Sequence, residues 1–189
     1  MSIATKRGDA GQTDLIGRVR VSKSHPCVEA YGNLDELTSQ LGFARSICRD
    51  EEVRDLIRTI QRHLFRLSAA VTTAPASNVS SEPGLLDLVP FLDEHLQRIE
   101  ATEGILADWS LPGDLPEAAA LDVARTVCRR AERSLVRLTE TDGPLQPEVL
   151  AYLNRLSDLL WLLGRLLEVR AGVNSALREK PGNRWSAAW

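Results

Sequence analysis

Thirteen consecutive residues, 125–137, concentrate positive charge in a chain that is negative overall. The segment reads Arg-Thr-Val-Cys-Arg-Arg-Ala-Glu-Arg-Ser-Leu-Val-Arg and carries a charge of +4, against −3 for all 189 residues. In an α-helix, Arg125, Arg129 and Arg133 form a ridge along one side, which we call the arginine ridge. Like charges four residues apart repel each other, so the ridge predicts a facing anion. That anion is either a phosphate group or a set of acidic side chains from another helix or subunit. A solvated basic face with loose ion pairs is the alternative.

A second basic element lies within the first 24 residues, which are also rich in glycine. Residues 5–13 read Thr-Lys-Arg-Gly-Asp-Ala-Gly-Gln-Thr, and Arg18, Arg20, Ser22 and Lys23 follow. Glycines let backbone N–H groups approach phosphate oxygens, and threonine and lysine side chains add further donors. The Walker A pattern is missing. The segment therefore predicts an irregular loop ordered by a ligand, although a basic terminus without a ligand has the same composition.

Polar side chains on two other predicted helices are candidates to face the arginine ridge. They are Glu29, Asp35, Glu36, Asn154, Arg155 and Asp158. We expect Glu36 to be simply exposed to solvent. Trp109 stands apart, because it lies on an irregular segment, where it either covers an apolar ligand or closes the end of a bundle.

Several common kinds of site are missing from the sequence. There is no Glu-x-x-His pair for a di-iron bundle, no HExxH and no GxSxG. The three cysteines are isolated and the first 25 residues lack an apolar signal core, which favours a reduced protein of the cytoplasm. The most apolar run, 156–169, is too short to span a bilayer. The net charge argues against a nucleic-acid binder.

The elements that must position these groups are helices. Apolar residues recur at three and four positions over 26–48, 51–72, 85–107, 117–141 and 147–172. The third of these has Leu88, Leu92, Leu96, Ile99 and Leu106 on its apolar face. Residues 73–84 are expected to form a surface loop, and no strand of alternating period is found. The sequence predicts an all-α five-helix bundle over 25–173, preceded by an irregular loop, 1–24, and followed by a tail, 174–189.

Three blocks occur in order along nearly the whole chain. Residues 5–13 with Arg20-Val-Ser-Lys23 are similar to T-x-T-G-D-x-G-x-T and RVSK, and residues 28–37 look like VEAYGxxDEL. The third block comprises Leu-Pro-Gly at 111–113 and residues 124–133 and 152–160. Together they resemble the PduO-type ATP:corrinoid adenosyltransferases, also called ATP:cob(I)alamin adenosyltransferases.

The resemblance implies a five-helix bundle that assembles as a homotrimer with active sites between subunits. It implies transfer of the 5′-deoxyadenosyl group of ATP to the cobalt of cob(I)alamin, obtained from cob(II)alamin, with release of triphosphate. Mg²⁺ would share the triphosphate charge. A flavin reductant and an adenosylcobalamin-dependent enzyme are the further partners it suggests, with no nucleic acid and no membrane.

The resemblance also implies roles for individual residues. The loop that wraps the nucleotide phosphates corresponds to Thr5, Gly8, Asp9, Gly11, Thr13 and Lys23. Arg129 matches an arginine that contacts the ATP phosphates, and Glu132 and Asn154 match further nucleotide-site residues. Arg125 matches an arginine that forms a salt bridge with an aspartate of the next subunit, and Asp35 matches that aspartate.

The chain departs from the family pattern at positions that bear on activity. Trp109 replaces the usual phenylalanine of the family. The resemblance implies that the aromatic side chain at this position excludes the lower axial ligand of the corrinoid and so eases reduction of Co(II). Arg7 replaces a threonine, Ala10 replaces a commonly basic residue, and Arg18 and Asp114 replace glycines. Arg7, Ala10 and Trp109 keep one alternative open, a non-catalytic module that binds or delivers ATP or corrinoid. The arginine ridge leaves another, a helical oligomer whose ridge makes only salt bridges between subunits.

Overall fold

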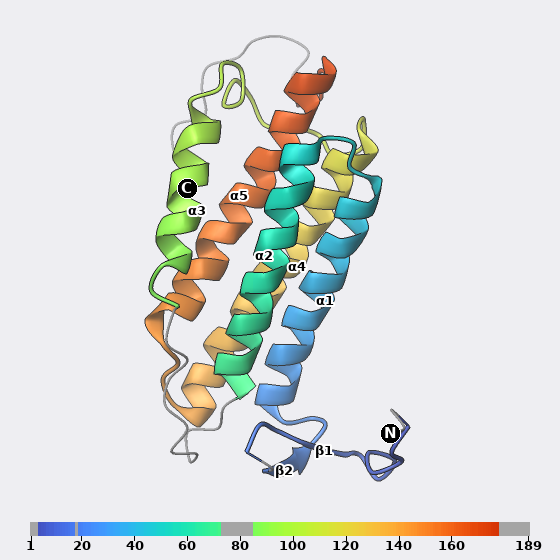
Figure 1. Cartoon of the computed structure of the whole chain (residues 1–189), viewed down its shortest axis with the longest axis vertical. Helices are drawn as coiled ribbons and strands as arrows, with labels where there is room; N and C mark the ends of the chain where they lie inside the picture. Colours follow the sequence, from blue (N-terminus) through green and yellow to red (C-terminus); the bar gives the residue numbers. More distant parts are fainter. Residues whose placement is uncertain (1–3, 18, 73–84, 178–189) are drawn as a thin grey trace.

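The computed structural model describes residues 4–17, 19–72 and 85–177, and within them the chain forms five α-helices and one short hairpin (Figure 1). The helices are α1 (Pro26–Ile47), α2 (Glu51–Thr72), α3 (Leu88–Glu100), α4 (Pro116–Asp142) and α5 (Pro147–Ala171). The predicted all-α five-helix architecture is therefore confirmed. Arg18, the loop predicted at 73–84 and the part of the tail from 178 onward lie outside the described residues.

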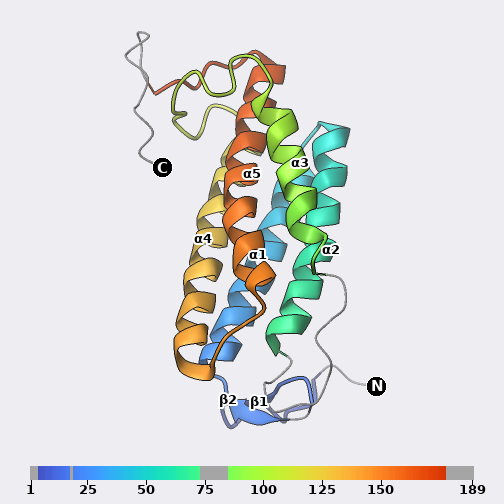
Figure 2. The same cartoon turned by 90° about the vertical axis from the view of Figure 1, so that its left-hand side faces the viewer.

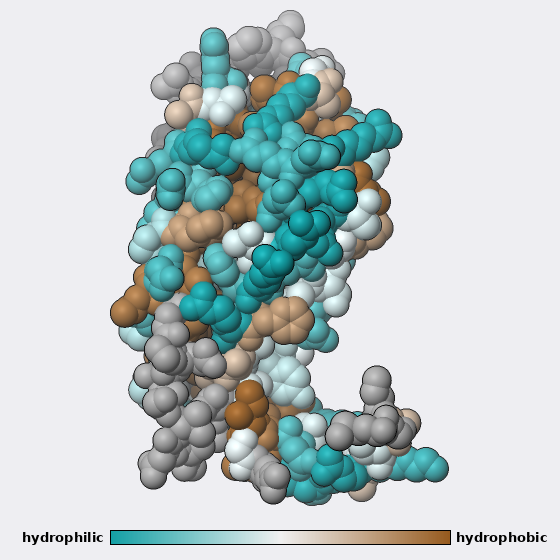
Figure 3. All heavy atoms as spheres, viewed as in Figure 1, coloured by the Kyte–Doolittle hydropathy of each residue, from teal (hydrophilic) through white to brown (hydrophobic). Residues whose placement is uncertain are grey.

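The helices pack side by side along one long axis. α1 packs against α2 and α4, α4 also packs against α5, and α3 lies on α5 (Figure 2). Their apolar stripes meet in a core that includes Leu37, Ile60, Leu135 and Leu160, all without exposed surface. The outer face in Figure 3 is mostly hydrophilic, as the stripe pattern requires. Across the described helices, none combines the length and the apolar character needed to cross a bilayer.

Local signals explain where the helices begin and end. His25 caps α1, because its Nδ1 accepts a hydrogen bond from the backbone N–H of Cys27 at 3.2 Å, and Pro26 occupies the first turn. Asp50 caps α2 in the same way, through Val53 N–H at 3.0 Å. Gly172 ends α5 with a φ of 67°, in the left-handed region that glycine adopts without strain.

The N-terminal segment differs from the prediction, because it contains strands. β1 (Gln12–Asp14) and β2 (Arg20–Ser22) pair antiparallel at the end of the bundle where α1 begins. Strands of three residues are too short to show an alternating pattern, so periodicity did not predict them. Contacts of the hairpin hold its two strands together instead. Leu15 is buried against the core, and the Arg20 side chain donates to Gln12 Oε1 at 3.0 Å and to Asp14 Oδ1 at 3.2 Å.

The third helix is shorter than predicted. It ends at Glu100 rather than near 107, and Gly104, with a φ of 86°, turns the chain within a run of short-range turns. This turn changes which side chain faces inward. Ile105 is buried, whereas Leu106, predicted to lie on the apolar face, is 60% exposed.

The reversal at 105 and 106 has a measurable consequence for stability. Replacing Ile105 with alanine is expected to lower the free energy of unfolding by about 2–5 kcal/mol, because it removes buried methyl groups and leaves a cavity. The matched control is Leu106→Ala, which should change it by less than about 0.5 kcal/mol because the side chain already meets water. Urea unfolding of both variants measures the difference. Equal losses would mean that the helix continues through 107 as the periodicity predicts.

Candidate functional site

Polar side chains from α4 and α5 line one exposed face, which we call the α4–α5 face and define by Arg129, Glu132, Asn154 and Asp158. Asn154 Nδ2 donates to Glu132 Oε1 at 3.4 Å, which joins the two helices across this face. Arg129 and Asp158 lie one turn further along, close enough for their charges to interact. The structure therefore brings together three residues that the sequence assigned to a nucleotide site.

Asp158 is exposed on α5, beside Arg129 of α4. Neighbouring atoms displace part of the water around its carboxyl and so raise its pKa above the ordinary value, and the positive charges of Arg155 and Arg129 offset part of that rise. An acid beside Arg129 neutralises part of the arginine's charge until an anionic ligand competes for it. Asp158 and Arg129 thus form an oppositely charged pair across α4 and α5.

The raised pKa of Asp158 predicts a pH-dependent effect on stability. The folded state holds the proton to a higher pH than the unfolded chain, so stability falls as pH rises from the unfolded pKa through the folded pKa. Asp158→Asn lacks this cost, and we expect it to raise the free energy of unfolding at pH 7 by ~0.5 kcal/mol or less, with no difference near pH 3. Thermal unfolding at pH 3 to 7 measures this, with the exposed Asp55→Asn as the control. A difference that grows as pH falls would contradict the assignment.

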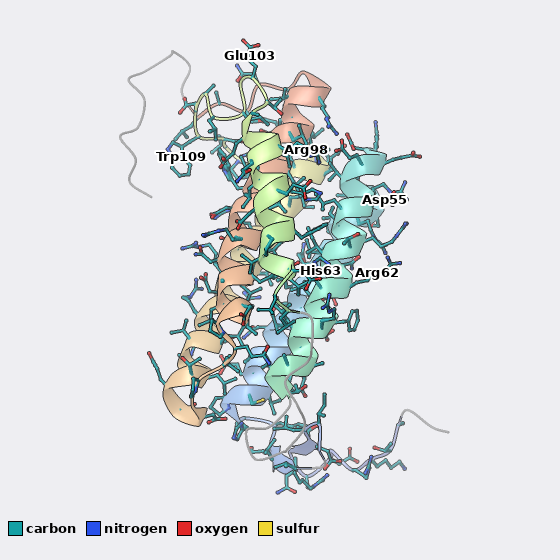
Figure 4. The ribbon with its side chains drawn as sticks, turned by 60° about the vertical axis from the view of Figure 1, so that its left-hand side comes forward. Asp55, Arg62, His63, Arg98, Glu103 and Trp109 are labelled. Carbon is teal, nitrogen blue, oxygen red and sulfur yellow. The ribbon has the colours of Figure 1, made fainter. Side chains whose placement is uncertain are left out.

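Trp109 lies on the segment between α3 and α4, at the end of the bundle opposite the hairpin (Figure 4). Its ring meets the ring of Trp161 edge to face, with centroids 6.1 Å apart. Trp161 lies on α5 three residues after Asp158, on the same side of the helix. An aromatic surface and the α4–α5 face are therefore continuous along one side of the subunit. Trp161 was missed by the sequence analysis, although its spacing from Asp158 was a usable signal.

A buried charged cluster lies next to these aromatic rings. Arg165 NH2 donates to Asp122 Oδ2 at 3.1 Å and to Glu168 Oε1 at 2.8 Å, and all three side chains are at most 8% exposed. We call Asp122, Arg165 and Glu168 the buried charge cluster. The sequence analysis did not single out any role for it. Charged residues at core positions of two apolar helices were the signal that pointed there.

The arginine ridge does not act as one unit within a subunit. Arg125 points toward the buried charge cluster, with its Nε 3.6 Å from Asp122 Oδ1, whereas Arg129 and Arg133 are exposed. Other arginines of the same segment pair with acids of α1: Arg137 with Glu29 at 3.1 Å, and Arg130 with Glu36. Glu36 is thus exposed, as expected, but it also holds an ion pair.

Asp35, the predicted partner of Arg125, is exposed on α1. The ion pair between Glu36 and Arg130 places this part of α1 level with residue 130 of α4. Arg125 lies five residues earlier, about 8 Å along the helix axis. Asp35 and Arg125 of one subunit are thus offset along the bundle, and a salt bridge between them from different subunits stays a prediction.

The N-terminal loop brings several of its predicted phosphate-binding groups together. A Cβ atom at Gly8 would come within 3.1 Å of Lys23 Nζ, so the lysine lies directly against this glycine. Lys23 N–H also donates to the Gly11 carbonyl at 2.9 Å. Thr13 pairs with Val21 in the hairpin, next to these residues. Thr5 and Asp9 are exposed on the same loop.

The loop and Arg129 are far apart within one subunit. His25, which follows the loop, lies 3.7 Å from Asp142 at the end of α4. Arg129 is thirteen residues from that end, which corresponds to about 20 Å along the helix axis. One subunit therefore presents two separate halves of the predicted nucleotide site.

Comparisons with known proteins identify the family of the chain. Residues 3–167 match the family described as cobalamin adenosyltransferase. The chain is 39% identical over 184 residues to the corrinoid adenosyltransferase PduO of Salmonella typhimurium, covering 95% of this chain and 53% of that protein. It is also 37% identical to a cobalamin adenosyltransferase of Cupriavidus metallidurans, covering 94% of each protein. The chain spans about half the length of the PduO relatives it matches.

A solved structure shows the same fold. A variant PduO-type ATP:corrinoid adenosyltransferase from Lactobacillus reuteri, complexed with cobalamin and ATP, superimposes with a TM-score of 0.88 at 30% identity. The match covers 96% of this chain and 98% of that one. Residues 3–167 of the family match include residues 5–23 of the N-terminal loop and the four residues of the α4–α5 face. On these grounds the chain belongs to the cobalamin adenosyltransferase family.

Proposed function

We propose that this protein transfers the 5′-deoxyadenosyl group of ATP to the cobalt of a reduced corrinoid. The observation that carries the proposal is the continuity of the α4–α5 face, with Arg129 at its centre, and the aromatic pair Trp109 and Trp161 at one end. A face with a cationic part and an aromatic part suits a substrate pair made of a polyphosphate and a large apolar ring.

The reaction needs little acid–base help from the protein. The Co(I) centre donates an electron pair to C5′ of ATP, a Co–C bond forms, and the C5′–O bond breaks. The oxygen leaves with its electron pair as part of triphosphate. The chain's own contribution is to orient C5′ toward cobalt and to stabilise the departing charge, for which Arg129 is the main candidate and Glu132 and Asn154 position its surroundings.

Magnesium is expected to arrive with ATP as part of the substrate. Within residues 4–17, 19–72 and 85–177, no three acidic, histidine or cysteine side chains gather closely enough to hold a metal ion. Mg²⁺ commonly keeps several waters and binds through substrate phosphates with one or two carboxylates. This fits an ion held mainly by the triphosphate.

We propose that the working form is a homotrimer with active sites between subunits. The separation of about 20 Å between the loop and Arg129 supports this assembly, because a neighbouring copy can supply the missing half of the site. In the same assembly Asp35 of one subunit would pair with Arg125 of the next. Size-exclusion chromatography with light scattering tests the trimer, and Asp35→Ala should weaken it.

Trp109 is proposed to lie against the lower face of the corrinoid and to exclude its lower ligand. Its partly exposed ring, backed by Trp161, supports this placement. A flavin reductant would then supply the electron, and an adenosylcobalamin-dependent enzyme would receive the product. The three cysteines are free and buried, which suits a reducing compartment such as the cytoplasm.

The proposed function is tested by mixing the protein with MgATP and cob(I)alamin under anaerobic reducing conditions. Conversion to adenosylcobalamin, followed by absorbance, is the expected result. The second candidate, a non-catalytic binding module, is favoured by the loop: Arg7 departs from the family pattern and lies 3.6 Å from Asp14, an ion pair within the loop itself. ATP binding by calorimetry without any conversion would support that candidate and contradict the first.

A further inference from the structure

The segment that carries Trp109 is attached to α5 through a charged side chain. Ser110 Oγ donates to both carboxylate oxygens of Glu168, each at 3.3 Å. Glu168 is itself held by Arg165, whose NH2 donates to it at 2.8 Å. The residue next to Trp109 is therefore linked directly to the buried charge cluster.

Arg165 is also connected to the Trp109 ring through the ring of Trp161. The Arg165 guanidinium carbon lies 5.5 Å from the centroid of the Trp161 ring, and the Trp161 ring meets Trp109 edge to face. Trp161, Arg165 and Glu168 are spaced by four and three residues, so all three lie on one side of α5. The backbone adds a third constraint, since Leu177 N–H donates to the Trp109 carbonyl at 2.7 Å.

The buried charge cluster also extends to the arginine ridge. Asp122 lies 3.1 Å from Arg165 and 3.6 Å from Arg125, so one carboxylate serves both arginines. Desolvation makes a buried ion pair a weak source of stability, and well-packed apolar residues often replace one without loss. The contacts of this cluster with Ser110 and Trp161 give it a role that apolar side chains cannot fill.

We propose that Asp122, Arg165 and Glu168, acting through Ser110 and Trp161, are positioning residues that set the place of Trp109. The proposal rests on the proposed function in one respect, the contact between Trp109 and the corrinoid. Glu168 binds Ser110, and Arg165 contacts both Glu168 and the Trp161 ring. Asp122 accepts a hydrogen bond from Arg165 and so fixes the orientation of its guanidinium. Because a displacement of about 1 Å at a reacting centre costs up to 100-fold in rate, small movements of Trp109 have a large effect.

The decisive variants are Ser110→Ala and Glu168→Gln. The first removes the link and leaves the buried charge cluster intact. The second keeps the shape of the side chain and removes its charge. The matched control is Ser134→Ala, because Ser134 is buried and its hydroxyl donates to the Ala131 carbonyl of its own helix, away from Trp109. Protein labelled with 5-fluorotryptophan gives a fluorine NMR signal for Trp109, assigned with Trp109→Phe, and this readout needs no activity.

Both decisive variants should shift the Trp109 signal, and the control should not. Adenosylation of cob(II)alamin in the presence of a reductant should fall about tenfold in Ser110→Ala, with less than a threefold loss for cobinamide, which lacks the nucleotide base, and an unchanged KM for ATP. An unchanged Trp109 signal in both variants, or equal losses for the two corrinoids, would overturn the proposal. If the wild-type protein converts no corrinoid while the signal still shifts, the positioning role stands and the proposed function fails.

Discussion

Replacing Arg129 with alanine is expected to lower kcat/KM for ATP by about 100-fold without changing the assembly. A hydrogen bond to a charged group contributes about 1.5–3 kcal/mol, and each 1.36 kcal/mol corresponds to a factor of ten in rate. Arg129 is exposed at the centre of the α4–α5 face, so its loss removes a phosphate contact without opening a cavity in the core. Steady-state kinetics and calorimetric titration with ATP measure the change.

The matched control for Arg129 is Arg137→Ala. Arg137 lies on the same helix and is exposed, but it pairs with Glu29 on the side toward α1. Exposed ion pairs of this kind contribute about 0–1 kcal/mol, so this variant should keep its affinity for ATP. If Arg129→Ala dissociates the oligomer while ATP binding is unchanged, the ridge serves only contacts between subunits and the phosphate role is wrong.

Replacing Trp109 with alanine is expected to reduce adenosylation by about 100-fold when cob(II)alamin and a reductant are supplied. The substitution removes the ring that is proposed to exclude the lower ligand, so the cobalt keeps that ligand and is harder to reduce. The expected loss of about 100-fold corresponds to the rate penalty for a misplacement of about 1 Å at a reacting centre. Affinity for ATP should be unchanged, because Arg129 and the loop are untouched.

Trp109→Phe is the informative companion of Trp109→Ala. It keeps an aromatic ring at the position, and most of the activity should therefore remain. The exposed aromatic Phe65, 68% exposed on α2, provides a control, and Phe65→Ala should have no effect on either substrate. Equal activity of the alanine and phenylalanine variants would show that position 109 has no contact with the corrinoid.

Much of the helical architecture could be predicted because helix signals are local. α1, α2, α4 and α5 have bounds within about one residue of the predicted ones, since prolines, caps and glycines act on their own neighbourhood. α3 was the exception. Its apolar periodicity continues past Glu100, but the chain turns at Gly104. As a result Ile105 is buried in the core and Leu106, which the periodicity placed there, is exposed.

The candidate site was predictable in its residue types and less so in its geometry. The family resemblance selected Arg129, Glu132 and Asn154, and the structure joins them across α4 and α5, with Asp158 beside Arg129. Helical spacing supplied the arginine ridge. Helical spacing also grouped Arg125 with Arg129, whereas in the structure Arg125 contacts Asp122 and Arg129 is exposed. The positions of residues along one helix do not determine which neighbouring side chains pack against each of its turns. The hairpin was unpredictable for a related reason, since its order comes from Arg20 and the burial of Leu15 rather than from strand periodicity.

The sequence by itself determined the five-helix class, the family, and the residues that are candidates for phosphate binding. These follow from periodicity, from local capping and from motifs read in order along the chain. Only the tertiary structure decided that Trp109 meets Trp161, that Arg165 joins Asp122 to Glu168, and that the loop adjoins the end of α4 about 20 Å along the helix axis from Arg129. The physical reason is that contacts between α4, α5 and the segment before α4 depend on how helices pack. A one-dimensional pattern specifies which side of each helix is buried and leaves its partner open.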